Sequence, residues 1–176
     1  MTLPRHLQLK DQRRATIRRA RPEDADVWIA NGNTVGAEMV YLMTEKFVRT
    51  PDEVRRQFAE APPERELWLV AEIDGRVVGG ANFVRGKSTK SAHVGDLGMS
   101  ILADYRNLGL GTAILEEGIE WARSVRVSRL KLGVFATNER AIALYRKFGF
   151  VEEGRLVGEV ILDGQPVDEV LMALRL

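Results

Sequence analysis

The sequence contains no cysteine, which excludes disulfide bonds, thiolate metal ligands and a cysteine nucleophile. Histidine is nearly as scarce, since His6 and His93 are the only two. These two residues alone do not make a convincing ligand set for a transition metal, so we expect no metal. The absence of cysteine also fits a reducing compartment, and we expect a cytoplasmic protein.

Long apolar runs are missing too. The dense stretch LWLVAEI at 67–73 is far too short to cross a bilayer, and the first residues lack the apolar core of a signal peptide, so we expect no membrane partner. The net charge is only +1, which argues against a nucleic-acid partner. Basic residues do gather near the start. We interpret them as a solvated tail plus one strand end, with a basic patch for an anionic partner as the alternative. They are Arg13, Arg14, Arg18, Arg19 and Arg21.

What is present fits one globular domain. The chain has 176 residues, 45% apolar and 29% charged, without repeats or linkers. We expect residues 1–14 to be an N-terminal tail and residues 15–176 to form a single domain. The expected strands are 15–20, 66–74, 76–84, 93–102, 130–135, 150–162 and 167–174. The expected helices begin at 22 and 50, run from a glycine-rich turn to 125, and span 138–148. This order predicts an α/β (α+β) protein with a mixed sheet and helices on its faces.

A glycine-rich turn, ILADYRNLGLGTAI, joins an expected strand to an expected helix. Gly109 and Gly111 lie where the helix begins, so a phosphate can approach free backbone N–H groups there. Arg106 can add a charge-assisted contact. A nucleotide P-loop is excluded because no Lys-Ser/Thr follows Gly111, and a dinucleotide fingerprint is excluded because position 114 is Ile. The alternative is a turn whose glycines serve tight strand–helix packing.

A second motif, NERAIALYRKFGF, follows one strand later. Asn138 is a good helix cap, Glu139 suits the first turn, and Gly149 closes the helix. Tyr145 lies two turns after the cap, near the face of the cap. The alternative for this tyrosine is an ordinary core position with its hydroxyl bound to a partner.

The two motifs together resemble those of the GNAT N-acetyltransferases. The family pattern is Arg/Gln-x-x-Gly-x-Gly/Ala followed by Asn-x-x-Ala-x-x-x-Tyr-x-x-x-Gly-Phe. Its fixed positions are all present, as Arg106, Gly109, Gly111, Asn138, Ala141, Tyr145, Gly149 and Phe150. The likeness covers residues 92–175, whereas the first ninety residues fit by element order only. The C-terminal run also looks like that of members acting on polyamines, amino acids or ribosomal-protein and other protein amino-termini.

The resemblance implies a GNAT fold, a mixed and mostly antiparallel sheet that splays between two central parallel strands, here 93–102 and 130–135, with helices on both faces. It implies acetyl-CoA as the acyl donor. The pantetheine arm would pair with Ile101, Leu102 and Ala103. The pyrophosphate would lie on the amides of Arg106, Asn107, Leu108, Gly109, Leu110, Gly111 and Thr112. Asn138 and Tyr145 would face the thioester end, and Ala141 belongs to the same set of cofactor-binding residues.

The chemistry implied is direct attack by a neutral amine in a ternary complex. Our candidate base is Asp96, because related enzymes often have an acid near this point, and it would act through a water or in a buried, more basic form. The alternative is that Asp96 binds the substrate ammonium or a backbone group. His93 is a second candidate base, or else caps a strand end. Tyr145 suits the acid role because a phenol is protonated at neutral pH, and a backbone N–H near Leu102 would stabilise the oxyanion.

For the acceptor, the resemblance points to residues 31–43 and 159–168. Glu38 and Tyr41 could bind a cationic or polar acceptor, and the alternative is a loop with a core-facing helix. The sequence leaves open whether the acceptor is a polyamine, an amino acid, an antibiotic amine or a protein amino-terminus. Two other functions remain as alternatives, a non-catalytic coenzyme A sensor and a nucleic-acid-binding module. A homodimer is common in the family, but nothing in the sequence establishes one.

Overall fold

The computed structural model describes residues 3–43 and 46–176. The helices are α1 Ala25–Gly36, α2 Pro51–Glu60, α3 Leu110–Ser124 and α4 Glu139–Lys147. The strands are β1 Arg5–Gln8, β2 Arg14–Arg19, β3 Glu66–Ile73, β4 Arg76–Arg85, β5 Val94–Ile101, β6 Arg129–Phe135, β7 Val151–Leu162 and β8 Gln165–Arg175. Within the described residues they form one sheet in the order β1-β2-β3-β4-β5-β6-β8-β7. The mixed α/β architecture is therefore confirmed. None of the described helices is long and apolar enough to span a membrane.

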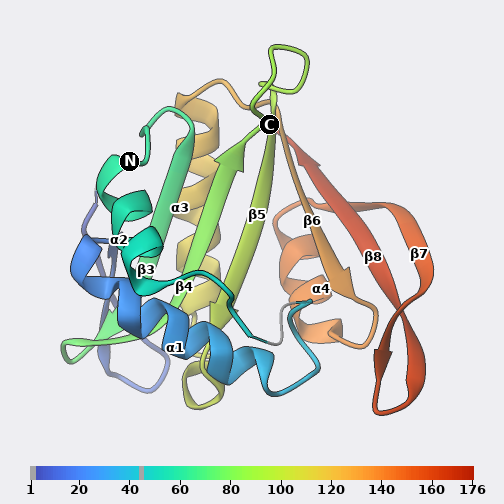
Figure 1. Cartoon of the computed structure of the whole chain (residues 1–176), viewed down its shortest axis with the longest axis horizontal. Helices are drawn as coiled ribbons and strands as arrows, with labels where there is room; N and C mark the ends of the chain where they lie inside the picture. Colours follow the sequence, from blue (N-terminus) through green and yellow to red (C-terminus); the bar gives the residue numbers. More distant parts are fainter. Residues whose placement is uncertain (1–2, 44–45) are drawn as a thin grey trace.

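One pair of neighbouring strands is parallel, and it determines the shape of the sheet. β5 and β6 are paired only from Val94↔Arg129 to Asp96↔Lys131, whereas the other neighbours are antiparallel. Beyond Asp96 the two strands diverge (Figure 1). The expected splay between two central parallel strands is confirmed. On the far side of the splay, β8 pairs with β6 along the whole length of β6 and keeps that half of the sheet together.

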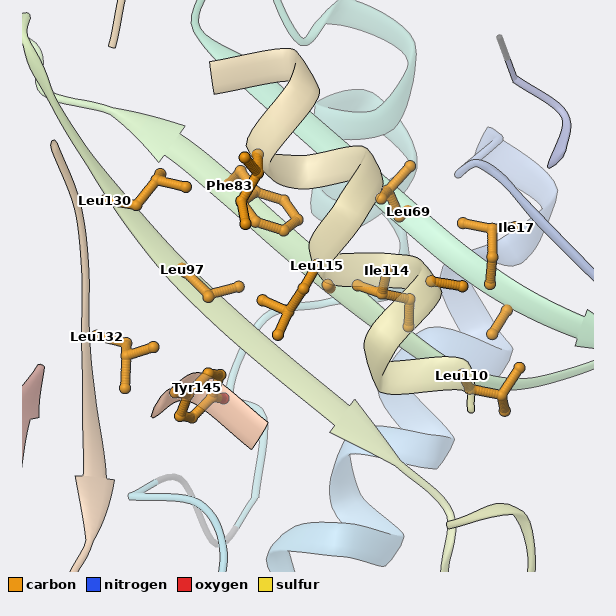
Figure 2. Close-up of a cluster of buried hydrophobic side chains, with 14 of the residues drawn as sticks. Ile17, Leu69, Phe83, Leu97, Leu110, Ile114, Leu115, Leu130, Leu132 and Tyr145 are labelled. Carbon is orange, nitrogen blue, oxygen red and sulfur yellow. The ribbon is translucent and has the colours of Figure 1, made fainter. Parts of the chain in front are cut away.

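Helices cover both faces of the sheet (Figure 1). α1 and α2 pack on one face, and α3 and α4 cover the other. The core between α3 and the sheet is dense, as Figure 2 shows. A Cβ on Gly118 would overlap the ring of Phe83, so the absence of a side chain lets α3 lie against β4. This packing holds the start of α3 at the open end of the splay.

Local turn chemistry explains the two hairpins. Asp74 and Gly75 have φ of 50° and 76°, and Asp163 and Gly164 repeat these values. Two consecutive residues with positive φ form the turn whose twist matches a two-residue hairpin, and Asp-Gly is a preferred sequence for it. Both turns expected from the sequence therefore join the strands as predicted.

The described part of the expected tail, residues 3–14, is not a solvated tail. β1 pairs with β2 from Arg5↔Ile17 to Gln8↔Arg14, and Leu9 is buried in the core. The strand is short and polar, so its sequence carries little strand signal, and its stability comes from contacts with distant residues: pairing with β2 and ion pairs of Arg5 with Glu116 and Glu117 on α3.

The basic cluster near the start is partly neutralised within the protein. Arg18 forms ion pairs with Asp24 and Glu72, and Arg13 pairs with Asp11 and lies over the Tyr105 ring. These contacts favour the interpretation as a strand end over a basic patch.

Candidate active site

The diverging strands leave a cavity of about 1120 Å³. Its walls come from β5, β6, the start of α3, α4 and the loop after α1. Many of the expected cofactor residues line it, namely Ile101, Arg106, Asn107, Gly109, Gly111, Thr112, Asn138, Ala141 and Tyr145. Four others, Leu102, Ala103, Leu108 and Leu110, are not part of its lining. The structure thus brings the two sequence motifs together at one cavity.

The edge of β5 that faces the splay has backbone groups without a strand partner, although the Ile101 carbonyl accepts a hydrogen bond from Arg106. Leu102 N–H donates to the carbonyl of Val78 on β4, and Gly86 N–H donates to Val94. Since backbone groups alternate sides along a strand, those of Met99 and Ile101 point the other way, into the splay. We expected a backbone N–H near Leu102 as the oxyanion donor: that of Leu102 itself is bound to Val78, whereas those of Met99 and Ile101 face the splay.

The start of α3 is shaped to receive an anion. Ala113 N–H makes the first helical bond, to Gly109, so the N–H groups of Leu110, Gly111 and Thr112 have no helical partner. Gly109 has φ of 104°, and a Cβ on it would meet no atom within 4 Å. Glycine is required here by its backbone conformation, and the space beside it is open. The arrangement fits a pyrophosphate held by helix-terminal amides.

Gly111 is needed for a different reason. A Cβ there would lie 3.0 Å from Leu144 on α4. The interpretation of the glycines as packing residues therefore holds for Gly111, whereas Gly109 fits the cradle.

We expected Arg106 to bind the acyl donor and Glu38 and Tyr41 to bind the acceptor, but the structure places these three side chains together. The Arg106 guanidinium donates to both carboxylate oxygens of Glu38, at 2.7 and 2.5 Å, and its Nε donates to the carbonyl of Ile101 at 2.8 Å. It also lies 4.4 Å from the centre of the Tyr41 ring. The hydrogen bonds to Glu38 hold the pKa of Arg106 above its ordinary value. Arg106 and Tyr41 line the cavity, so this cluster connects the loop after α1 to the cradle.

Tyr145 lies where α4 meets the cavity. Its side chain packs with the apolar core (Figure 2). Its ring also contacts that of Phe150, with ring centres 5.6 Å apart. It is only 7% exposed, and burial raises the pKa of its phenol to about 12. The hydroxyl makes no hydrogen bond with any residue that the structure describes. Tyr145 is thus protonated at neutral pH and has a free donor in a cavity.

Asn138 lines the cavity and also caps the helix that carries this tyrosine. Its side-chain oxygen accepts a hydrogen bond from Ala141 N–H at 3.2 Å and caps α4. The cap that the sequence predicted is confirmed, and it fixes the helix from which Tyr145 projects.

Asp96 lies apart from Tyr145. It is in the last paired rung of β5 and β6, its side chain is 58% exposed, and it forms an ion pair with Lys131 at 2.9 Å. It lines a smaller pocket rather than the main cavity. The expected base is therefore not brought to the reaction centre, because its strand position precedes the splay. His93 is exposed just before β5, and its carbonyl accepts from Ser128 and Arg129, which suits a strand-end role.

Sequence reasoning missed five charged residues that line the cavity, namely Lys10, Glu139, Arg140, Lys147 and Glu169, and two of them matter for the argument below. Lys10, from the loop between β1 and β2, was assigned to the tail. Glu169, on β8, lies one residue beyond the range 159–168 that we expected to bind the acceptor. Its signal was weak, because it is one of two adjacent acids, Asp168 and Glu169, at the start of the otherwise apolar run VDEVLMAL.

Comparisons with known proteins identify the class. The model of the "Acetyltransferase (GNAT) family" matches residues 28–150. The chain belongs to the GNAT acetyltransferase family.

Individual relatives agree with this assignment. The chain is 33% identical to the L-amino acid N-acetyltransferase of Escherichia coli K12 over 136 residues, which cover 76% of this chain and 83% of the relative. It also resembles a solved GNAT acetyltransferase of Streptococcus pneumoniae, with a TM-score of 0.86 and 32% identity over 92% of this chain and 99% of that one. The yncA protein of Salmonella typhimurium, solved with its cofactor acetyl-CoA, shares the fold at a TM-score of 0.81 and 20% identity, covering 92% and 93% of the two chains.

Proposed function

We propose that this protein transfers an acetyl group from acetyl-CoA to a primary amine of a small molecule or a protein amino-terminus, by direct attack in a ternary complex. The observation that carries the proposal is one cavity that contains an anion cradle at the start of α3 and a protonated tyrosine on α4. A non-catalytic coenzyme A sensor has no use for a buried phenol with a free hydroxyl, so we favour the enzyme.

The residues fit acetyl-CoA as donor. The free N–H groups of Leu110, Gly111 and Thr112 and the open space at Gly109 would hold the pyrophosphate. Lys10 lines the cavity near this turn and adds positive charge. The splay edge of β5 offers backbone groups without a strand partner to the amides of the pantetheine arm. When bound, acetyl-CoA supplies the thioester whose acyl carbon the amine attacks.

Tyr145 assists the leaving sulfur. A phenol with a pKa of about 12 is a weaker acid than a thiol, whose ordinary pKa is about 8.5. Complete proton transfer to a thiolate would be uphill by roughly three units, or about 5 kcal/mol. Tyr145 therefore acts mainly as a hydrogen-bond donor that stabilises the developing negative charge, with the proton finally supplied by solvent.

The acceptor side is formed by the loop after α1 and by β6 and β8. Tyr41 lines the cavity, and Glu38 fixes Arg106 beneath it. Tyr41 and Glu38 therefore both belong to the acceptor side, and Glu38 acts by positioning Arg106. An amino acid is the first acceptor to test because of the likeness to an L-amino acid N-acetyltransferase. A cytoplasmic location stays a prediction.

The decisive experiment is a calorimetric titration with acetyl-CoA, followed by thiol-release assays. The amine panel contains the L-amino acids, spermidine and a short peptide with a free amino-terminus. We expect micromolar binding of acetyl-CoA and amine-dependent thiol release. Absence of binding would remove the proposal, and binding without turnover on any amine would favour the sensor.

A homodimer also stays a prediction. β7 is an edge strand whose exposed side chains include Val157 and Ile161. An open edge can pair with its copy about a twofold axis. Light scattering should then report a dimer that Val157→Asp dissociates, whereas a monomeric wild type contradicts this expectation.

A further inference from the structure

Glu169 reaches the cavity across a neighbouring strand. In the register of β6 and β8 it lies opposite Phe135, next to the Gly133↔Leu171 pair on the same face. A Cβ on Gly133 would overlap the Oε1 atom of Glu169. The carboxylate therefore occupies the space that any other residue at position 133 would fill. Both residues line the cavity, and Gly133 lies beyond the last paired rung of β5 and β6.

The carboxylate lies on the opposite side of the sheet from Tyr145. Leu132 and Val134 on β6 pack in the core that includes Tyr145 of α4. Since side chains alternate along a strand, Gly133 faces away from α4, toward the side covered by α1 and the loop that follows it. Glu169 shares that face through its pairing with Phe135. Tyr145 and the Glu169 carboxylate thus line one cavity from opposite faces of the sheet.

Glu169 also differs from the other acids of this part of the sheet. Asp96 is paired with Lys131, Glu153 with Arg129, and Asp168 with Arg155. Glu169 makes no ion pair or hydrogen bond with any described residue, although it is partly buried. A partly buried carboxylate without a cation is unfavourable unless water or a ligand serves it. The Glu169 carboxylate lies at the acceptor end of the cavity, where the cationic group of an acceptor can pair with it.

We propose that Glu169 is the residue that receives the acceptor amine: it binds the ammonium, passes one of its protons to solvent so that the amine becomes neutral, and takes a second proton from the nitrogen as the new bond forms. This inference rests on the proposed acetyl transfer. The lone pair of the neutral amine forms the N–C bond to the acyl carbon, and the C–S bond breaks with its electron pair on sulfur. One N–H proton passes to the Glu169 carboxylate and then to solvent, while Tyr145 donates a hydrogen bond to the sulfur, which solvent protonates. Bond formation acidifies the nitrogen, so a carboxylate is a sufficient acceptor at that moment.

The geometry gives two independent ways to remove this function. Glu169→Gln keeps the shape and removes the charge. Gly133→Ala keeps the charge but adds the Cβ that displaces the flexible end of Glu169, and the φ of Gly133 lies outside the left-handed region, so alanine is tolerated. Glu60→Gln, exposed on α2, makes the same chemical change far from the cavity and serves as the matched control.

The test compares these variants and the double variant with the amine of the panel that the wild type uses best. We expect Glu169→Gln to lower kcat/KM for the amine about 10²-fold or more, the usual size of a general-base effect. Its pH profile should move to higher pH, because the amine must then lose its proton in solution. The Kd of acetyl-CoA should stay within about twofold of wild type, and the affinity of the amine for the enzyme saturated with coenzyme A should fall about tenfold. Glu60→Gln should match the wild type.

Gly133→Ala decides between Glu169 as the acting group and a general disturbance of the strand. It should reduce kcat/KM in the same direction, and the double variant should be no worse than Glu169→Gln alone, because both changes remove one interaction. Wild-type kcat/KM and amine affinity in Glu169→Gln would overturn the inference, as would additive losses in the double variant. If the wild type acetylates no amine, the proposed function fails first and the inference fails with it.

Discussion

Gly109→Ala tests the anion cradle directly. Gly109 has φ of 104°, in the region that side chains with a Cβ rarely adopt. Forcing alanine into it costs roughly 1–2 kcal/mol of folding free energy. For a chain of this length, that corresponds to a fall in Tm of about 2–8 °C. The new Cβ points into open space, so no clash adds to this loss.

Binding should suffer more than folding. The Cβ projects beside the free N–H groups at the start of α3, where the pyrophosphate would lie. Losing one hydrogen bond to a charged group amounts to about 1.5–3 kcal/mol. The affinity for acetyl-CoA should therefore fall about ten- to a hundredfold.

Gly75→Ala is the matched control. Gly75 also has positive φ, 76°, and a Cβ on it would likewise meet nothing within 4 Å, but it lies in the hairpin between β3 and β4. Both variants should lose similar stability by thermal denaturation, and only Gly109→Ala should lose acetyl-CoA affinity by calorimetry. Equal affinities in the two variants would refute the cradle.

Three further predictions concern side chains. Tyr145→Phe should lower kcat about 10²-fold with acetyl-CoA affinity unchanged. Because the pKa of this phenol is about 12, the wild-type rate should show no loss from Tyr145 ionisation up to about pH 10. A fall in rate below pH 10 that is absent from the variant would contradict this. Glu38→Gln should free Arg106 and tighten acetyl-CoA binding about three- to tenfold by calorimetry, whereas weaker binding would mean that the ion pair organises the turn. For Asp24, burial raises the pKa, but hydrogen bonds, first from Arg18, lower it by more, so the folded pKa is depressed. Its stabilisation is present above the unfolded pKa of about 4 and is lost as pH falls through the lower folded value. Asp24→Asn should therefore lower Tm at pH 7, and the difference from the wild type should shrink as pH falls below about 4, which denaturation scans will check.

Features encoded by local chemistry were predictable from the sequence. The two Asp-Gly hairpins, the cap at Asn138 and the cradle at Gly109 each depend on the conformation of a few consecutive residues. Such signals remain visible without knowledge of the fold. The same holds for the helix that follows the cradle.

Features that depend on strand register were not predictable in this way. Asp96 was close to the splay in sequence, but its position in the last paired rung and its pairing with Lys131 place it outside the cavity. The space that Glu169 fills exists because Gly133, on another strand, has no side chain. β1 forms by pairing with the edge of β2. Each of these facts joins residues far apart in the chain.

The two ends of the cavity also differ in whether backbone groups or side chains form them. The proposed cradle consists mainly of backbone groups held by a helix terminus and a glycine conformation, so most side-chain substitutions elsewhere should leave it intact. The acceptor end is made of side chains on the loop after α1 and on β8, which can change one at a time. Glu38 connects the two ends through Arg106, since the loop that borders the acceptor holds the arginine beside the cradle. Substitutions at Glu169 or Tyr41 should therefore change which amine is accepted while the affinity for acetyl-CoA stays the same. A substitution at Glu38 should instead alter the affinity for acetyl-CoA first.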